Sequence, residues 1–113
     1  MSKRLNSRQK GVTGEREFAQ VLQERKLCAR RGQQFAGGTD SPDVICTSLS
    51  NIHFEVKRVQ AGNPYLWLEQ AIRDAGDLNY PVVAHRRNGK DWIAIVEMDF
   101  LLDLLIRREG DFI

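Results

Sequence analysis

Residues 41–59 read SPDVICTSLSNIHFEVKRV, and this stretch decides the fold. Its two apolar runs, 43–47 and 52–59, have the composition of short strands, and the residues between them are typical of a turn. The spacing predicts a β-hairpin that brings Asp43 close to Glu55. Two adjacent carboxylates repel each other, so either one is protonated or a cation lies between them. A hard divalent cation such as Mg²⁺, which prefers oxygen ligands, would relieve the repulsion.

The alternation of side chains along the second strand places Lys57 on the same face as Glu55, with His53 as a neighbour of the site rather than a ligand. An ammonium group beside a metal-bound water can orient that water or offset charge that builds up on a phosphodiester during cleavage. The hairpin therefore favours metal-assisted phosphodiester hydrolysis. A solvated face of charged residues is the simpler alternative for the same pattern.

Two residues outside the hairpin are candidates for the same site. Glu15 lies three positions before Phe18 in a helical pattern, so it projects from the side of the helix that faces the core. It can supply a third carboxylate, although the rim of a core or a helix N-terminus also accounts for an acid there. Gln70 lies at the edge of an apolar helical stripe, where its amide can orient a nucleophile or a phosphate oxygen. Solvent exposure explains Gln70 equally well.

The rest of the chain has an α/β pattern. The expected elements, in chain order, are a helix from Thr13, strands over 29–35, 43–47 and 52–59, a helix over 65–75, strands over 81–87 and 92–97, and a helix over 100–108. This order predicts one mixed five-stranded sheet flanked by helices. A length of 113 residues indicates a single domain over 13–113, preceded by a polar, basic segment over 1–12 that is either an arm or the frayed start of a helix.

Positive charge is concentrated at the start of the chain. The whole sequence has 17 Lys and Arg against 15 Asp and Glu, yet the first 31 residues hold nine of these cations and three of the anions. This asymmetry indicates a surface for a polyanion such as DNA, or else a solvated tail. The candidate phosphate contacts are Lys3, Arg4, Arg8, Lys10, Arg30, Arg31 and Arg58.

Two later features are interpreted as structural. Arg86, Arg87 and Lys90 cluster at an Asn-Gly hairpin turn, and we interpret them as an exposed turn rather than a second binding site. For Trp67 we favour packing over stacking on a base.

The sequence also predicts a cytoplasmic protein. No apolar run approaches the roughly 18 to 20 residues that span a bilayer, and no apolar segment follows the basic N-terminus. Cys28 and Cys46 are far apart and form no CxxC pair, which is typical of a reduced, intracellular chain.

Taken together, Lys10-Gly11 before Glu15, then Asp43, then Glu55-Val56-Lys57 resemble the PD-(D/E)xK nuclease superfamily, most closely the archaeal-type Holliday junction resolvases and related small phage-type nucleases. The resemblance covers residues 10–58 and implies a restriction-endonuclease-like core. It implies that Glu15, Asp43 and Glu55 bind Mg²⁺ together with the main-chain carbonyl of Val56. It also implies that Mn²⁺ can replace Mg²⁺ at this site. Lys57 would then assist the attacking water.

The same resemblance implies a substrate and an assembly. Thr39 or Ser41, near the Gly-rich turn, would accompany the site, and a homodimer would cut two strands of branched DNA symmetrically, as in DNA recombination. The apolar helix Phe100–Arg108 is the candidate interface, unless it is buried on two sides within one chain. The expected function is a Mg²⁺-dependent, junction-selective DNA endonuclease. The alternatives are a nuclease for other branched, flap or nicked DNA and a non-catalytic DNA-binding module, because the C-terminal half departs from the resolvase pattern.

Overall fold

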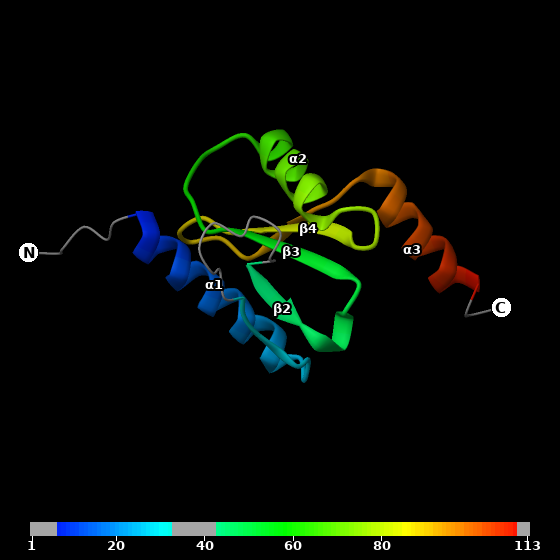
Figure 1. Cartoon of the computed structure of the whole chain (residues 1–113), viewed down its shortest axis with the longest axis horizontal. Coiled ribbons are helices and arrows are strands. Elements are labelled where there is room, and N and C mark those ends of the chain that lie inside the picture. The colour runs from blue at the N-terminus through cyan, green and yellow to red at the C-terminus, as the bar shows by residue number, and fades with distance from the viewer. Residues whose placement is uncertain (1–6, 33–42, 111–113) are drawn as a thin grey trace, which may run out of the picture.

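The computed structural model describes residues 7–32 and 43–110, and it has the predicted α/β architecture of one mixed five-stranded sheet and three helices (Figure 1). The helices are α1 (Ser7–Glu24), α2 (Pro64–Ala75) and α3 (Met98–Gly110), with a short 3-10 helix, η1 (Thr47–Leu49). The strands are β1 (Ala29–Arg31), β2 (Val44–Cys46), β3 (Ile52–Lys57), β4 (Tyr80–His85) and β5 (Ile93–Ile95).

The strands follow one another across the sheet in chain order, and β3 pairs with β4 in parallel whereas the other pairs are antiparallel. The parallel pair needs a crossover, which α2 supplies. In the β2–β3 hairpin Val44 is opposite Phe54, so the preceding residue, Asp43, comes level with Glu55, as the spacing predicted.

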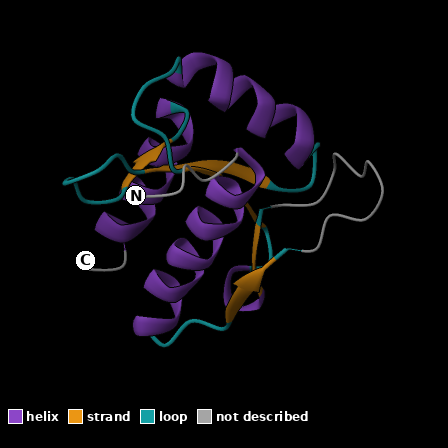
Figure 2. Ribbon diagram, turned by 90° about the vertical axis from the view of Figure 1, so that its left-hand side faces the viewer, coloured by secondary structure: helices purple, strands orange, loops and turns teal. Residues whose placement is uncertain are grey.

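The two faces of β3 have different partners. Phe54 faces α1, where its ring centroid lies 5.3 Å from that of Phe18. This face carries the apolar core, whose buried members are Phe18, Ala19, Val44, Cys46, Phe54 and Ala84. The other face of β3, with His53, Glu55 and Lys57, lies toward α2. In Figure 1, α2 lies above the strands and α1 below them, and Figure 2 shows the same separation after a turn of 90°.

Local sequence signals explain the ends of α2. The side chain of Asn63 accepts a hydrogen bond from the backbone N–H of Tyr65 (3.0 Å), and Pro64 occupies the first helical position, where its missing N–H costs nothing. Gly76 ends the helix at φ 67°, a conformation that glycine adopts without strain. The helix therefore begins and ends within one residue of the predicted range, which fixes the side chains that it presents to β3.

Several predicted boundaries were wrong. The first helix begins at Ser7 rather than Thr13, so residues 7–12 of the basic segment are helical, which suits the good helix formers Arg8, Gln9 and Lys10. The first strand ends at Arg31, and the expected continuation to residue 35, like the turn that follows it, lies outside the described residues. The other strands are one to three residues shorter than predicted.

The last helix projects away from the sheet (Figure 1). Phe100 stacks on Tyr80 with ring centroids 4.9 Å apart, which attaches the start of α3 to β4. Beyond this contact the apolar side chains Leu101, Leu102, Leu104, Leu105 and Ile106 are 37% to 68% exposed, so the part of the chain that the structure describes does not bury the helix on two sides. Among the described residues, no helix is both long enough and apolar enough to cross a membrane.

Candidate functional site

The first helix approaches the end of β3 closely at Gly14. This residue is buried, and a methyl group in its place would collide with the Cβ atom of Arg58 while also touching Val56. Only glycine therefore allows the helix backbone to lie this near the strand. The close approach brings Glu15, the next residue, to the sheet, as its position beside the core stripe predicted.

Glu15 is one of three acidic residues, with Asp43 and Glu55, on the elements that form this part of the sheet. Its side chain is 15% exposed and accepts a 2.6 Å hydrogen bond from Nε of Arg31. Burial raises the pKa of Glu15, the bond to Arg31 lowers it, and the charge of Asp43 raises it again. The last contribution shows that Glu15 on α1 and Asp43 beside β2 interact electrostatically.

Asp43 is held by backbone contacts on two sides. Its Oδ2 accepts a 2.8 Å hydrogen bond from the backbone N–H of Val56, and its own N–H donates to the carbonyl of Phe54 at 2.9 Å. Its carbonyl accepts a hydrogen bond from the N–H of Gly32 at 2.8 Å. These contacts fix the carboxylate against β3, between Glu15 and Glu55.

Glu55 is 3% exposed and carries the strongest electrostatic perturbation of the site. The pKa of Glu55 is raised to about 7, chiefly by burial and further by the charge of Asp43 and by hydrogen-bonding contact with Asp43 and Asp74. A 2.9 Å hydrogen bond between Oε1 and Nε2 of His53 acts in the opposite direction. The carboxyl group therefore retains its proton to a higher pH than an ordinary glutamate does.

Asp43 interacts electrostatically with the two other carboxylates that the sequence singled out, Glu15 and Glu55, whereas the group whose ligand atoms all lie within 4.8 Å of one another is His53, Glu55 and Asp74. Glu15 comes from α1, Asp43 from the residue before β2, and Glu55 from β3, with Asp43 interacting with both of the others. Repulsion and burial raise the pKa of both Glu15 and Glu55, and a bound cation would remove this cost. The arrangement has the chemistry of a site for a cation that prefers oxygen ligands.

Lys57 and Gln70 are also brought together. Nζ of Lys57 donates a 3.1 Å hydrogen bond to Oε1 of Gln70, and both residues are partly buried. Gln70 is therefore not simply a solvent-exposed amide of α2. It holds the ammonium group on the face of β3 that carries Glu55.

A second group of possible ligands includes residues that the sequence analysis did not assign. His53, Glu55 and Asp74 each offer one ligand atom, and these atoms lie within 4.8 Å of one another, so the group can hold a metal ion. His53 was interpreted as a neighbour of the site, and Asp74 was missed. The available signal was the spacing of Gln70 and Asp74, which are four positions apart and so share a face of α2.

The residues predicted to contact DNA differ in whether they are exposed or already paired with an acidic residue. Arg31 is paired with Glu15, Arg58 donates from Nε to Glu17 at 3.3 Å, and Arg30 is exposed. The backbones of Arg8 and Lys10 lie in the first turns of α1, although their side chains lie outside the description. The remaining candidates also lie outside the described residues: Lys3, Arg4, Thr39 and Ser41.

Glu17 has a role that helical periodicity did not predict. Its carboxylate accepts hydrogen bonds from both Arg58 and Arg86. Arg58 follows β3 and Arg86 follows β4, so one acidic side chain of α1 joins the carboxyl ends of the two parallel strands. This network stabilises the edge of the sheet at which the candidate site lies.

Comparisons with protein-family models, with curated proteins and with solved structures gave no match to this chain.

Proposed function

We propose that the protein is a metal-dependent nuclease that hydrolyses phosphodiester bonds in DNA. The observation that carries this proposal is the interaction of Asp43 with both Glu15 and Glu55 at one edge of the sheet, with Lys57 on the same face as Glu55. Several carboxylates beside one ammonium group are suited to placing a cation, a water molecule and a phosphate together.

The donor atoms support Mg²⁺ as the cation, with Mn²⁺ able to replace it. Glu15, Asp43 and Glu55 offer oxygen atoms, and the main-chain carbonyl of Val56 is the further ligand that the family resemblance implies. The raised pKa values of Glu15 and Glu55 also support a cation here, because its charge favours their ionised forms. His53 adds a nitrogen donor next to Glu55, which suits Mn²⁺ better than Mg²⁺.

Within this proposal the chain's own residues have separate tasks. The bound cation would polarise a phosphate oxygen and make a water molecule easier to deprotonate. Lys57, held by Gln70, would orient that water molecule and offset the negative charge that develops on the phosphate. The backbone N–H of Val56 keeps the carboxylate of Asp43 turned toward the site.

The substrate and the assembly rest on the family resemblance and on charge. We propose branched DNA as the substrate, a restriction-endonuclease-like core, and a homodimer in which the exposed apolar side of α3 meets a second copy. A nuclease for flap, nicked or otherwise branched DNA would use the same site. A non-catalytic DNA-binding module would have no need for Lys57 and Gln70 to be joined beside three carboxylates, so we favour the enzyme.

A cleavage assay with four substrates tests the proposal. The protein is incubated with a four-way junction, a flap, a nicked duplex and a single strand, each with Mg²⁺ or with EDTA. We expect paired, symmetric cuts on the junction that require Mg²⁺, and a loss of at least about 100-fold for Asp43→Asn and Lys57→Ala. Asp77→Asn, at an exposed carboxylate in the turn after α2, is the control. Absence of Mg²⁺-dependent cleavage on every substrate would reject the enzyme, and equal cleavage of all four would reject selectivity for junctions.

A further inference from the structure

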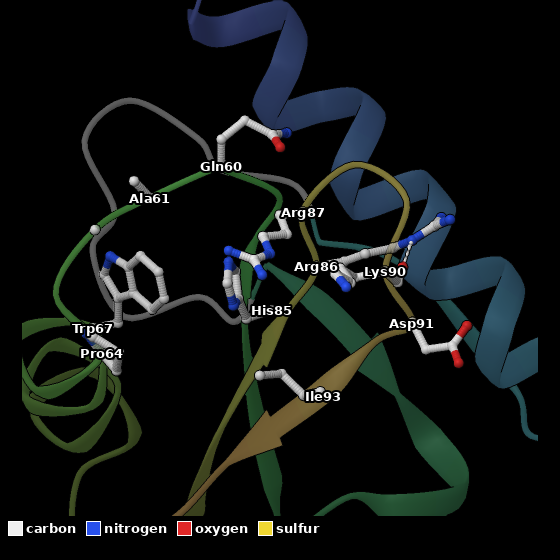
Figure 3. A pocket seen from close by; sticks show the side chains of 11 residues that line it. Gln60, Ala61, Pro64, Trp67, His85, Arg86, Arg87, Lys90, Asp91 and Ile93 are labelled. Atoms are coloured by element: carbon white, nitrogen blue, oxygen red, sulfur yellow. Dashed lines mark hydrogen bonds between the residues drawn. The ribbon is translucent and has the colours of Figure 1, made fainter.

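A pocket with a volume of about 620 Å³ lies just beyond the carboxyl ends of β3 and β4 (Figure 3). One wall is the segment between β3 and α2 together with Trp67 on the first turn of the helix. The other wall is the turn between β4 and β5, which carries Arg87 and Lys90, and His85 lies between the two walls. Clefts outside the carboxyl ends of parallel strands are frequent ligand sites.

The walls of this pocket are held in place by specific contacts. The backbone of Gly62 lies against the indole of Trp67 so closely that a methyl group at Gly62 would collide with the ring. The indole also meets the ring of His85, with ring centroids 4.7 Å apart at an interplanar angle of 49°. Trp67 therefore packs, as the sequence analysis favoured, and also lines the pocket.

Hydrogen bonds join the two walls. Nε2 of His85 and the carbonyl of Val59 are 3.0 Å apart, and the backbone N–H of Asn88 donates to the side-chain oxygen of Gln60, also at 3.0 Å. The first contact joins β4 to the segment after β3, and the second joins that segment to the β4–β5 turn. The pocket is thus a preformed feature rather than a gap between independent loops.

The charged side chains on the turn between β4 and β5 differ in whether they already form hydrogen bonds or ion pairs. Arg86 binds Glu17 and donates to the carbonyl of Lys90 at 2.6 Å, so its guanidinium group is occupied. The side chains of Arg87 and Lys90 are exposed, and within the described ranges neither forms a hydrogen bond or an ion pair. Two unpaired cations beside an aromatic wall are suited to an anionic ligand that carries a flat ring.

The pocket adjoins the candidate active site. His85 is the register partner of Lys57, and the backbone N–H of Arg86 donates to the carbonyl of Lys57 at 3.2 Å. Trp67 lies one helical turn before Gln70, which holds the ammonium of Lys57. A ligand in the pocket would therefore lie next to a phosphate bound at the carboxylates.

We infer that this pocket binds one unpaired nucleotide of a DNA strand, with its base at Trp67 and His85 and its phosphate at Arg87 and Lys90; this inference rests on the proposed function. A base within a duplex has both faces covered by its neighbours, whereas an unpaired base can stack on an aromatic side chain. Branched, flapped and frayed DNA offers such a nucleotide next to a duplex. The pocket would thus favour cleavage near a position where pairing ends.

Binding to two labelled DNA molecules tests this inference without any cleavage. One is a blunt duplex, and the other is the same duplex with a four-nucleotide single-stranded overhang, and both are measured by fluorescence anisotropy in EDTA. We expect the protein to bind the overhang DNA about tenfold more tightly, because stacking of one base changes affinity by about that factor or more. Arg87→Ala/Lys90→Ala should abolish the preference. Arg73→Ala/Arg107→Ala, which removes two exposed cations elsewhere, should preserve it.

A fluorescence measurement tests the base contact directly. In a Trp92→Phe background, Trp67 is the remaining tryptophan, and its emission should be quenched on addition of the oligonucleotide dT4. Equal affinity for both DNA molecules, or an equal loss of affinity for both in the Arg87→Ala/Lys90→Ala variant, would overturn the inference. Quenching by the free nucleotide dTMP with no preference for the overhang would also overturn it, because the ligand would then be a mononucleotide rather than DNA.

The two proposals can fail separately. A preference for the overhang that depends on Arg87 and Lys90, without Mg²⁺-dependent cleavage, would support the pocket and reject the nuclease. Mg²⁺-dependent cleavage with unchanged binding in Arg87→Ala/Lys90→Ala would support the nuclease and reject the pocket.

Discussion

Oδ2 of Asp43 accepts a 2.8 Å hydrogen bond from the backbone N–H of Val56, so the acidic side chain of the residue before β2 is bonded to the backbone of β3. Val56 lies between Glu55 and Lys57, the acidic and basic residues whose side chains share the other face of the strand. This bond sets the distance between the carboxylates of Asp43 and Glu55 and thereby contributes to the high pKa of Glu55. The pairing within the sheet and the electrostatics of the site thus depend on the same contact.

The high pKa of Glu55 predicts that the metal-free protein loses stability as the pH rises. The folded-state pKa is about 7 against an ordinary value of 4.5, so between these values the folded state retains a proton that the unfolded chain has released. The free energy of unfolding should therefore fall as the pH rises from 4.5 to 7, by about 2 to 3 kcal/mol from this group alone, and then level off. Below pH 4.5 the group is protonated in both states and contributes no pH dependence.

Urea unfolding in EDTA at pH 5 and pH 8 measures this effect. Glu55→Gln keeps the shape of the side chain but cannot ionise, so its unfolding free energy should decrease less than that of the unsubstituted protein between the two pH values. Mg²⁺ at pH 8 should stabilise the unsubstituted protein and have a smaller effect on Glu55→Gln. Parallel pH profiles for the two proteins would show that Glu55 does not titrate as the structure indicates.

The β-hairpin and its carboxylate pair could be predicted from the sequence because both depend on local rules. The alternation of apolar residues in β3 and the short turn before it determine the register, so Asp43 had to lie beside Glu55. The contact between His53 and Asp74 could not be predicted, because it depends on how far along β3 the helix α2 docks. The start of α1 was predicted wrongly for a related reason. Thr13 is a good N-cap residue, but packing and helix propensity allow the helix to begin earlier in the chain, at Ser7.

Gly14→Ala should destabilise the protein although alanine favours a helix. The added methyl group would meet the Cβ atom of Arg58, and separating α1 from β3 should cost about 1 to 3 kcal/mol. Gly11→Ala is a matched control in the same helix, because among the described residues no atom outside its chain neighbours and its own helix backbone lies within 4 Å of the position where its methyl group would be. It should stabilise the protein by about 0.5 to 1 kcal/mol. Thermal unfolding of both variants decides the matter, and equal changes in the two would mean that α1 does not approach β3 as described.

Gln70→Ala should reduce the rate of cleavage more than it reduces stability. Without the 3.1 Å hydrogen bond to Oε1 of Gln70, the ammonium group of Lys57 is free to move away from the site. Loss of a supporting contact of this kind lowers activity by about 10-fold to 100-fold. Glu69→Ala, which removes an exposed side chain from the neighbouring position of α2, is the control and should retain full activity. If kcat is the same for Gln70→Ala and Glu69→Ala, Gln70 does not position Lys57 during the reaction.

The exposed apolar side of α3 predicts self-association. Leu102 and Leu105 are 45% and 46% exposed on a helix that projects from the sheet, and a second copy of the helix would bury both. Sedimentation equilibrium at micromolar concentration should give the mass of a dimer, whereas Leu102→Lys/Leu105→Lys should give that of a monomer with an unchanged circular dichroism spectrum. Leu66→Lys, at an apolar residue that is 59% exposed in the first turn of α2, should remain dimeric. A monomeric unsubstituted protein would reject the dimer, and with it the paired, symmetric cleavage of a junction by two copies of this site.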